Sequence, residues 1–406
     1  MENFRRKSIR KEDIPNFDEG VKVSELLNIV QNNELSNKLL ELLEVKNIEN
    51  EFIKIKGAKT LVDIQKGINE RYQKEDLDSK VSDISLYNNM EFAINFNNIE
   101  NSIYFKELDL QQVSTTPIYS ATREFFSDLY QMDKYASSLI TDGQKVILET
   151  NLEMLKKICE HSKRYRILHD KNENLFYLRG IISLQKYFNY DNNLAVLIAL
   201  LTLHSETKKT GITYSMKLCE YNESFIRIFF ESSEITQLET IGNVKNIIEV
   251  SNDEVRREAL RFTGVCSIVF GNNEGSNNEL YINPKEIKSR ILSIGHNRIP
   301  KTAIEELANI DNTRTIHANL FVDIQKIAKI KNPEEIKFLV RDKVENAKTA
   351  EVKKLKSKLL TELNKQATDL IQLLTIFSKV ELLAGEDIDA LEYLRFIIYQ
   401  ALIDKK

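Results

Sequence analysis

Hydrophobic periodicity predicts a mixed α/β arrangement for the first third of the chain. Apolar residues three and four positions apart predict two short helices within residues 23–45. Strict alternation predicts a strand over residues 51–56, and residues 60–72 are expected to form a helix that Thr60 caps. The alternating segments 83–96 and 102–108 flank asparagines and predict a hairpin.

The middle of the chain has the strongest sheet pattern. The apolar run Leu194–Leu203 interrupts it, and at ten residues it is too short to span a bilayer, so it predicts a buried helix capped by Asp191 or Asn192. A bend is expected at Gly264. The expected strands cover residues 165–169, 175–183, 212–218, 224–231, 245–251 and 257–270. Antiparallel strands around one buried helix predict a compact α+β core.

Everything after Pro284 has a helical pattern. Apolar residues at steps of three and four over residues 333–383 predict a long amphipathic helix or a helix pair, and residues 388–403 a last helix that folds back. The predicted fold class is therefore α+β: a central, mostly antiparallel sheet with packed helices, then an all-helical C-terminal region. The expected divisions are a basic N-terminal arm (1–20), a mixed α/β region (21–140), a central sheet domain (141–283) and the helical region (284–406).

Composition narrows the class of protein. With 406 residues, 12 Gly and 5 Pro, the chain has few turn formers, and its net charge of −4 gives it no global basic field. The three cysteines are far apart, which is typical of a reducing compartment. Because no apolar segment follows the charged N-terminus, we expect a cytoplasmic protein without a membrane partner.

Familiar catalytic patterns are missing from the sequence. Cys159, His161 and His169 are close together, but their spacing is not that of a zinc site and a fourth ligand is lacking. Glu-x-Lys occurs at Glu44 and at Glu351, in both cases in a helical pattern that directs the two side chains apart. Neither a phosphate-binding glycine loop nor a nucleophile elbow is present. The sequence therefore predicts no catalytic residue, metal or cofactor.

Nucleic-acid contact is the best-supported binding hypothesis. Cations flank Tyr165 at the start of one expected strand, and more cations lie around another. Such residues on a sheet can stack bases and hold phosphates, although Glu254 and Glu258 lie beside the second group, which also fits an ordinary solvated surface. The candidate nucleic-acid-binding residues are Lys163, Arg164, Arg166, Arg256, Arg257 and Arg261.

One segment resembles a known group of proteins. Residues 247–255 (IIEVSNDEV), residues 259–262 (ALRF) and the Val265-Cys266 pair resemble the central pattern of an uncharacterised phage- and plasmid-borne domain family. This chain departs from that pattern, with Asp253 in place of Ser, Arg256 in place of Gly and Ser267 in place of Asn. The resemblance implies a mobile-element protein with an α+β core. The resemblance implies no catalytic residues for this chain, because none are established for that family.

Three functional hypotheses follow. The first is a non-enzymatic accessory protein of a mobile genetic element, a phage or plasmid, which binds DNA, RNA or a protein complex. The second is a metal-dependent hydrolase acting on nucleic acid, with Asp253 and Glu254 joined by His161 or His169. The third is a scaffold or regulatory protein that self-associates through its C-terminal helices.

Overall fold

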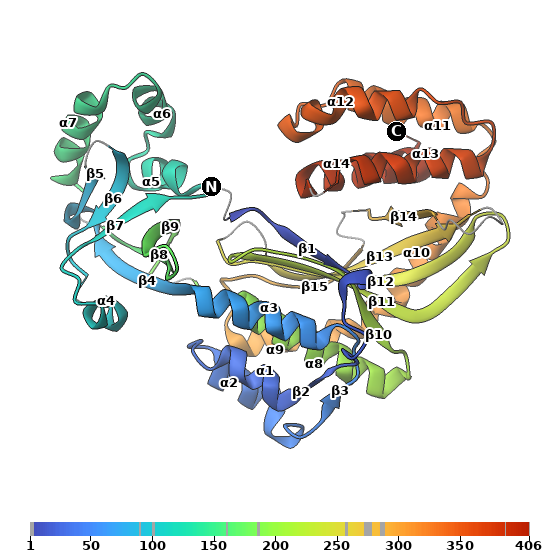
Figure 1. The fold of residues 1–406 in the computed structure, drawn as a ribbon, viewed down its shortest axis with the longest axis horizontal. Helices are drawn as coiled ribbons and strands as arrows, with labels where there is room; N and C mark the ends of the chain where they lie inside the picture. The colour runs from blue at the N-terminus through green and yellow to red at the C-terminus, as the bar shows by residue number, and fades with distance from the viewer. Residues whose placement is uncertain are drawn as a thin grey trace.

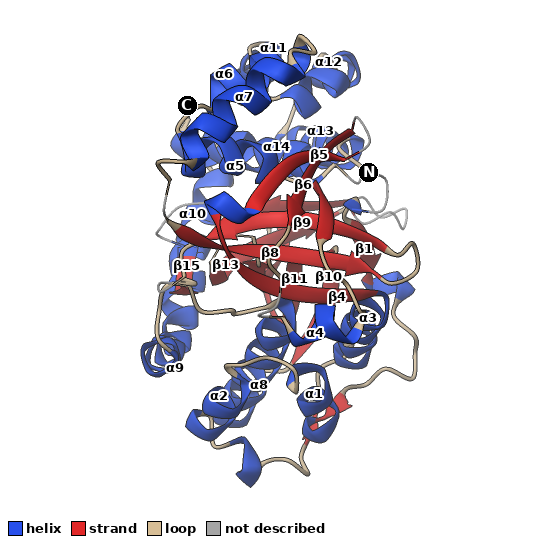
Figure 2. Ribbon diagram, turned by 90° about the vertical axis from the view of Figure 1, so that its left-hand side faces the viewer, coloured by secondary structure: helices blue, strands red, loops and turns tan. Residues whose placement is uncertain are grey.

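Two β-sheets organise this α+β chain, which confirms the predicted fold class. The larger sheet lies under the C-terminal helices in Figure 1, and the smaller one forms the lobe at the left. Figure 2 shows strands between helices on both sides. The computed structural model describes residues 4–88, 91–99, 102–159, 161–184, 187–255, 259–271, 278–284, 289–385 and 387–405.

The larger sheet has seven strands, all antiparallel, in the order β1-β10-β11-β12-β13-β14, with β15 also paired to β13. Its strands are β1 (Lys7–Arg10), β10 (Tyr214–Tyr221), β11 (Phe225–Leu238), β12 (Gly242–Asp253), β13 (Leu260–Phe270), β14 (Asn278–Ile282) and β15 (Arg290–Ile294). The predicted central strands are confirmed. The prediction that only helices follow Pro284 is wrong at β15, because that segment pairs with the part of β13 that β14 does not reach.

The smaller sheet has the order β4-β8-β9-β7-β6-β5. Its strands are β4 (Tyr72–Lys80), β5 (Ile84–Asn88), β6 (Glu91–Phe96), β7 (Val113–Pro117), β8 (Ser162–Asp170) and β9 (Leu175–Ile182). Four helices accompany it: α4 (Ile103–Glu107), α5 (Ala121–Tyr130), α6 (Asp133–Thr141) and α7 (Lys145–Lys156). The sheet cuts across the expected division at residue 140, since β4 pairs with β8. The predicted hairpin is wrong in its second arm, which is α4, capped by Ser102 Oγ accepting from Phe105 N at 3.2 Å.

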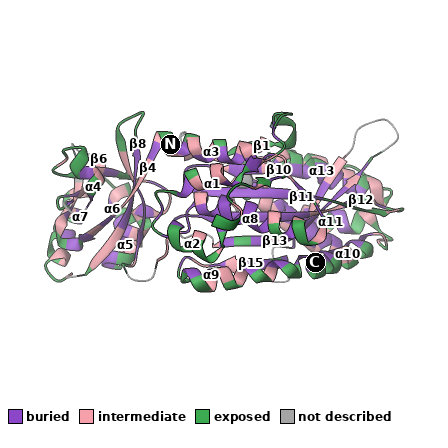
Figure 3. Ribbon diagram, turned by 90° about the horizontal axis from the view of Figure 1, so that it is seen from below, coloured by how far each residue is buried: buried purple, intermediate pink, exposed green. Residues whose placement is uncertain are grey.

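One face of the larger sheet packs on buried helices. The packing helices are α1 (Val23–Val30), α3 (Ala58–Arg71) and α8 (Asn192–Thr210), and Figure 3 shows them against the strands of this sheet. The short strands β2 (Val21–Lys22) and β3 (Phe52–Ile53) and helix α2 (Ser36–Leu42) lie beside them. The buried helix α8 and its predicted cap are confirmed, since Asp191 Oδ1 accepts from Leu194 N at 2.8 Å. Thr60 is not a cap. Helix α3 begins earlier, and the Asp18 carboxylate accepts from Thr60 N at 2.8 Å.

The C-terminal region is helical, as predicted. Its helices are α9 (Pro300–Leu307), α10 (Thr313–Ile327), α11 (Pro333–Glu345), α12 (Ala350–Leu363), α13 (Leu370–Leu383) and α14 (Ile388–Tyr399). The amphipathic stretch 333–383 is divided into α11, α12 and α13, and Asp369 caps α13 by accepting from Gln372 N at 2.8 Å. No helix in the described ranges combines the length and apolar character needed to cross a membrane.

Gly264 lets α10 approach β13 closely. A Cβ built at this position would lie 2.6 Å from Ile316 Cγ2, whereas a Cβ at Gly67, inside α3, would meet nothing within 4 Å. We expect Gly264→Ala to lower the free energy of unfolding by about 1–3 kcal/mol, because a buried helix must shift. Gly67→Ala should raise it by about 0.5–1 kcal/mol through helix propensity. Urea titration of both variants checks this pair, and a neutral Gly264→Ala would contradict the close approach.

Candidate functional site

The two arginines on β8 that were predicted to bind nucleic acid form ion pairs with aspartates. Arg164 pairs with both carboxylate oxygens of Asp78 at 2.7 and 3.0 Å. Arg166 is only 1% exposed, so the prediction that it contacts nucleic acid does not fit its position. Lys163 is half-buried on the same strand and Arg261 is exposed on β13, while Arg256 and Arg257 lie outside the described residues.

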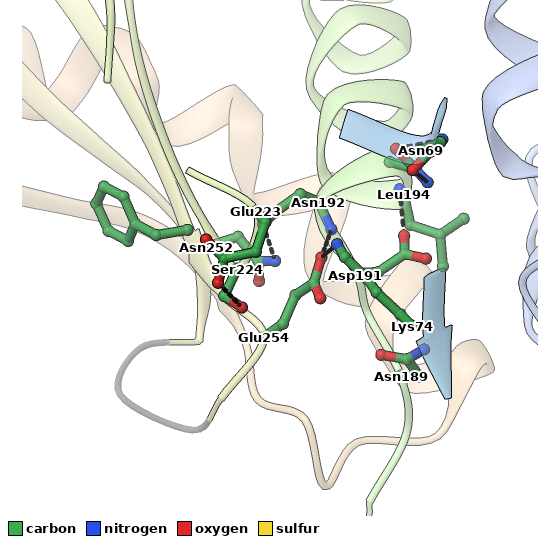
Figure 4. Close-up of polar contacts among 12 residues, drawn as sticks. Asn69, Lys74, Asn189, Asp191, Asn192, Leu194, Glu223, Ser224, Asn252 and Glu254 are labelled. Atoms are coloured by element: carbon green, nitrogen blue, oxygen red, sulfur yellow. Dashed lines mark hydrogen bonds and ion pairs between the residues drawn. The ribbon is translucent and has the colours of Figure 1, made fainter. Parts of the chain in front are cut away.

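Arg166 belongs to a buried polar network centred on Glu254. Figure 4 shows Lys74 and Asn192 beside the Glu254 carboxylate. The Glu254 carboxylate accepts hydrogen bonds from Lys74 Nζ at 2.6 Å and from Arg179 Nη1 at 2.8 Å. It also accepts from the backbone N–H of Asn192 at 2.9 Å, at the start of α8. Arg166 donates to the backbone carbonyl of Glu254. We call these five residues the Glu254 network: Lys74, Arg166, Arg179, Asn192 and Glu254.

The Glu254 network joins the two sheets. Lys74, Arg166 and Arg179 lie on β4, β8 and β9 of the smaller sheet, while Glu254 follows β12 of the larger one. Burial alone would raise the pKa of Glu254, but the three cations together lower it to about 2. The carboxylate is therefore ionised and fully enclosed, with an exposed fraction of 0%. Glu254 therefore links the larger sheet to the smaller one and is too deeply buried to contact a substrate.

The residues suspected for metal-dependent hydrolysis are not brought together. Asp253 and Glu254 are buried. His169 faces the opposite side of the smaller sheet from Arg166, three positions away on β8, with Nδ1 2.6 Å from Tyr104 Oη and Nε2 3.0 Å from Asn174 Oδ1. Among the residues that the structure describes, no group of three His, Cys, Asp or Glu is arranged to hold a metal ion.

A cleft of about 500 Å³ lies on the open face of the larger sheet, against α13 and α14. We call it the charged cleft. Ser8 of β1 and Glu220 of β10 are cross-strand partners, and both line the cleft from the sheet, which is its floor. Its charged lining residues are Arg6, Lys7, Arg10, Lys11, Glu12, Lys217, Glu220, Glu231, Lys245, Glu279, Glu381 and Arg395.

Lysines surround one carboxylate in the floor. Glu231 accepts from Lys217 at 3.0 Å and from Lys245 at 3.0 Å, and Lys11 lies at 3.4 Å. Lys217 is the extra residue of a β-bulge between Met216 and Leu218, which directs its side chain toward the cleft. Burial alone would raise the pKa of Glu231, but the lysines lower it to about 2. The floor thus contains fixed charges of both signs.

Helices α13 and α14 form the wall of the cleft. Ser378 Oγ donates to the backbone carbonyl of Glu279 at 2.7 Å, which ties α13 to the edge strand β14. The Arg395 guanidinium of α14 lies 4.1 Å from the ring centre of Tyr281. Burial raises the pKa of Glu381 to about 7, although Arg395 and the Tyr281 backbone N–H oppose the shift.

Strand β1 brings basic residues to the mouth of the cleft. Ile9 packs against the main core, so its neighbours Ser8 and Arg10 face the opposite side, where both line the cleft. Lys7, Arg10 and Lys11 are exposed. The expected basic arm (1–20) includes a strand, since residues 7–10 pair with β10. A strand of four residues is too short to show an alternating pattern of apolar and polar residues. The sequence therefore shows that this segment is basic but does not predict the strand.

We compared the chain with known families, curated proteins and solved structures. No protein-family model, no curated protein and no solved structure matches the chain. The charged cleft and its basic mouth are therefore the features on which a functional assignment rests.

Proposed function

We propose that this protein acts by binding nucleic acid at the charged cleft, with phosphates held at the mouth by β1. The observation that carries the proposal is the exposure of Lys7, Arg10 and Lys11 along one rim of a cleft of about 500 Å³. Lysine and arginine bind the phosphates of a nucleic acid whatever its base sequence. Such contacts supply most of the affinity in complexes that are not sequence-specific. The lining has seven Lys or Arg side chains and five Glu, an excess of two cations.

We further propose that the protein is an accessory protein of a mobile genetic element. This part of the proposal rests only on the sequence resemblance. The proposed site differs from the one first predicted, because the β8 arginines are neutralised by Asp76 and Asp78. The cations at the mouth have fewer acidic partners. Lys11 lies 3.4 Å from Glu231, and the Arg10 backbone N–H, not its guanidinium, donates to Asp13.

A paired charge reversal tests the proposal. In the double variant Lys7→Glu/Arg10→Glu, we expect binding of labelled DNA or RNA at 50–100 mM salt to weaken by at least tenfold. The slope of log affinity against log salt should become shallower by roughly 1.4 for single strands or 1.8 for B-DNA, since two phosphate contacts are lost. Fluorescence anisotropy over a salt series measures both quantities.

The matched control reverses two of the cations first predicted from the sequence, Lys163→Glu/Arg261→Glu. It changes the net charge by the same amount, and neither residue lines the charged cleft. It should leave affinity within about threefold of the unmodified protein. If this control loses as much affinity as the Lys7/Arg10 variant, binding does not depend on the mouth of the cleft and the proposal fails.

A further inference from the structure

The dimensions of the charged cleft restrict the form of nucleic acid that can enter it. A volume of about 500 Å³ is typical of sites that enclose a small molecule, so it suits a base or two. A duplex is a rod whose major groove alone is about 12 Å wide. It could lie across the mouth but could not reach the floor between the sheet and α13.

The charges of the floor also decide which part of the polymer it can accept. Glu220, Glu231 and Glu279 line the cleft, and the lysines around Glu231 lower its pKa to about 2. Because Glu231 and Glu279 are paired with lysines, the floor lacks the excess of cations that the rim offers to phosphates. Carboxylates accept hydrogen bonds from the exocyclic amino groups of bases, as in the pairing of Glu or Asp with cytosine N4. Phosphates therefore fit the rim and base edges fit the floor.

Two carboxylates that line the cleft, Glu220 and Glu381, each form a long ion pair with an arginine and each have one oxygen that accepts no hydrogen bond. Glu220 Oε2 and Glu381 Oε1 are buried and have no hydrogen-bond partner among the residues that the structure describes. Glu220 Oε2 lies 3.6 Å from the Arg227 guanidinium, which is beyond hydrogen-bond distance. Buried acceptors without donors are costly, so a ligand that supplies N–H groups would gain affinity here.

Building on the proposed function, we infer that the charged cleft binds single-stranded nucleic acid, with the backbone along β1 and unpaired bases directed at the floor. The amino groups of cytosine and adenine would donate to Glu220 and Glu381. Thymine lacks an exocyclic amine, and its single N3–H donor lies between two carbonyl oxygens that would face these carboxylates unfavourably. The site should therefore prefer strands rich in cytosine or adenine over strands rich in thymine.

The test compares a mixed-sequence 12-mer as a single strand and as its annealed duplex, together with dC12 and dT12, by fluorescence anisotropy at pH 7.5. We expect the single strand to bind at least tenfold more tightly than the duplex, and dC12 at least fivefold more tightly than dT12. Glu220→Gln should reduce the dC12 preference, whereas the distant surface substitution Glu153→Gln should not. The dC12-to-dT12 ratio in the unmodified protein does not depend on the folding of any variant.

The outcomes separate this inference from the proposed function. Equal or tighter binding of the duplex would overturn the inference and leave nucleic-acid binding intact. Equal affinity for dC12 and dT12 would overturn the placement of bases in the floor. Absence of binding to any of the four ligands at 50 mM salt would overturn the proposed function itself.

Discussion

Replacing Glu254 by alanine should lower the free energy of unfolding by about 3–5 kcal/mol, the cost expected when one partner of a buried ionic group is removed. The substitution would leave Lys74 and Arg179 without the carboxylate that accepts their hydrogen bonds. It would also remove a negative charge close to Arg166, and Arg166 and Arg179 are nearly or fully buried. It would also remove the acceptor for the Asn192 N–H at the start of α8. Urea titration followed by circular dichroism measures the loss.

The control for this prediction is an exposed ion pair. Glu153 is 66% exposed and pairs with Lys156 one helical turn away at 2.6 Å. Pairs of this kind contribute about 0.3–0.5 kcal/mol, so Glu153→Gln should change stability by no more than that. A Glu254→Ala variant as stable as Glu153→Gln would show that the network does not clamp the two sheets together.

The parts of the fold that the sequence predicts are those with a long and uninterrupted pattern. Helix α8 is largely apolar around its circumference because it lies between α1, α3 and the larger sheet. Its ten-residue run, apolar except for Thr202, already indicated burial. Strands β10 to β13 are each eight or more residues long. Short elements are decided by their tertiary partners instead. Helix α4 has five residues and β15 has five, and neither holds enough residues to establish a period.

The site was harder to predict than the fold. A sequence displays its cations but does not show which carboxylates neutralise them, and the partner of Arg166, Asp76, lies 90 positions away. The charged cleft brings together segments that are still further apart, since Lys11 and Glu231 are separated by 220 positions. The sequence shows only that the N-terminal arm is positively charged. It does not show that β1 pairs with β10 and so places these cations at the rim of the charged cleft.

Replacing Glu381 by glutamine should stabilise the protein at neutral to alkaline pH. In the folded chain the pKa of Glu381 is raised from 4.5 to about 7, chiefly by burial. Between these values the folded state holds a proton that the unfolded state has released, so the contribution of this group to stability falls as pH rises from 4.5 to 7. The shift corresponds to about 3 kcal/mol, which glutamine would recover because it resembles the protonated acid.

The expected result is a pH-dependent difference between the two proteins. At pH 4, below the unfolded pKa, Glu381→Gln and the unmodified protein should have nearly equal free energies of unfolding. At pH 8 the variant should be more stable by about 3 kcal/mol, measured by urea titration at both values. A variant that is less stable at pH 8 would mean that the ionised carboxylate and Arg395, 3.7 Å apart, attract each other strongly enough to offset burial. In that case α13 would be held against α14 by an ion pair in the wall of the charged cleft.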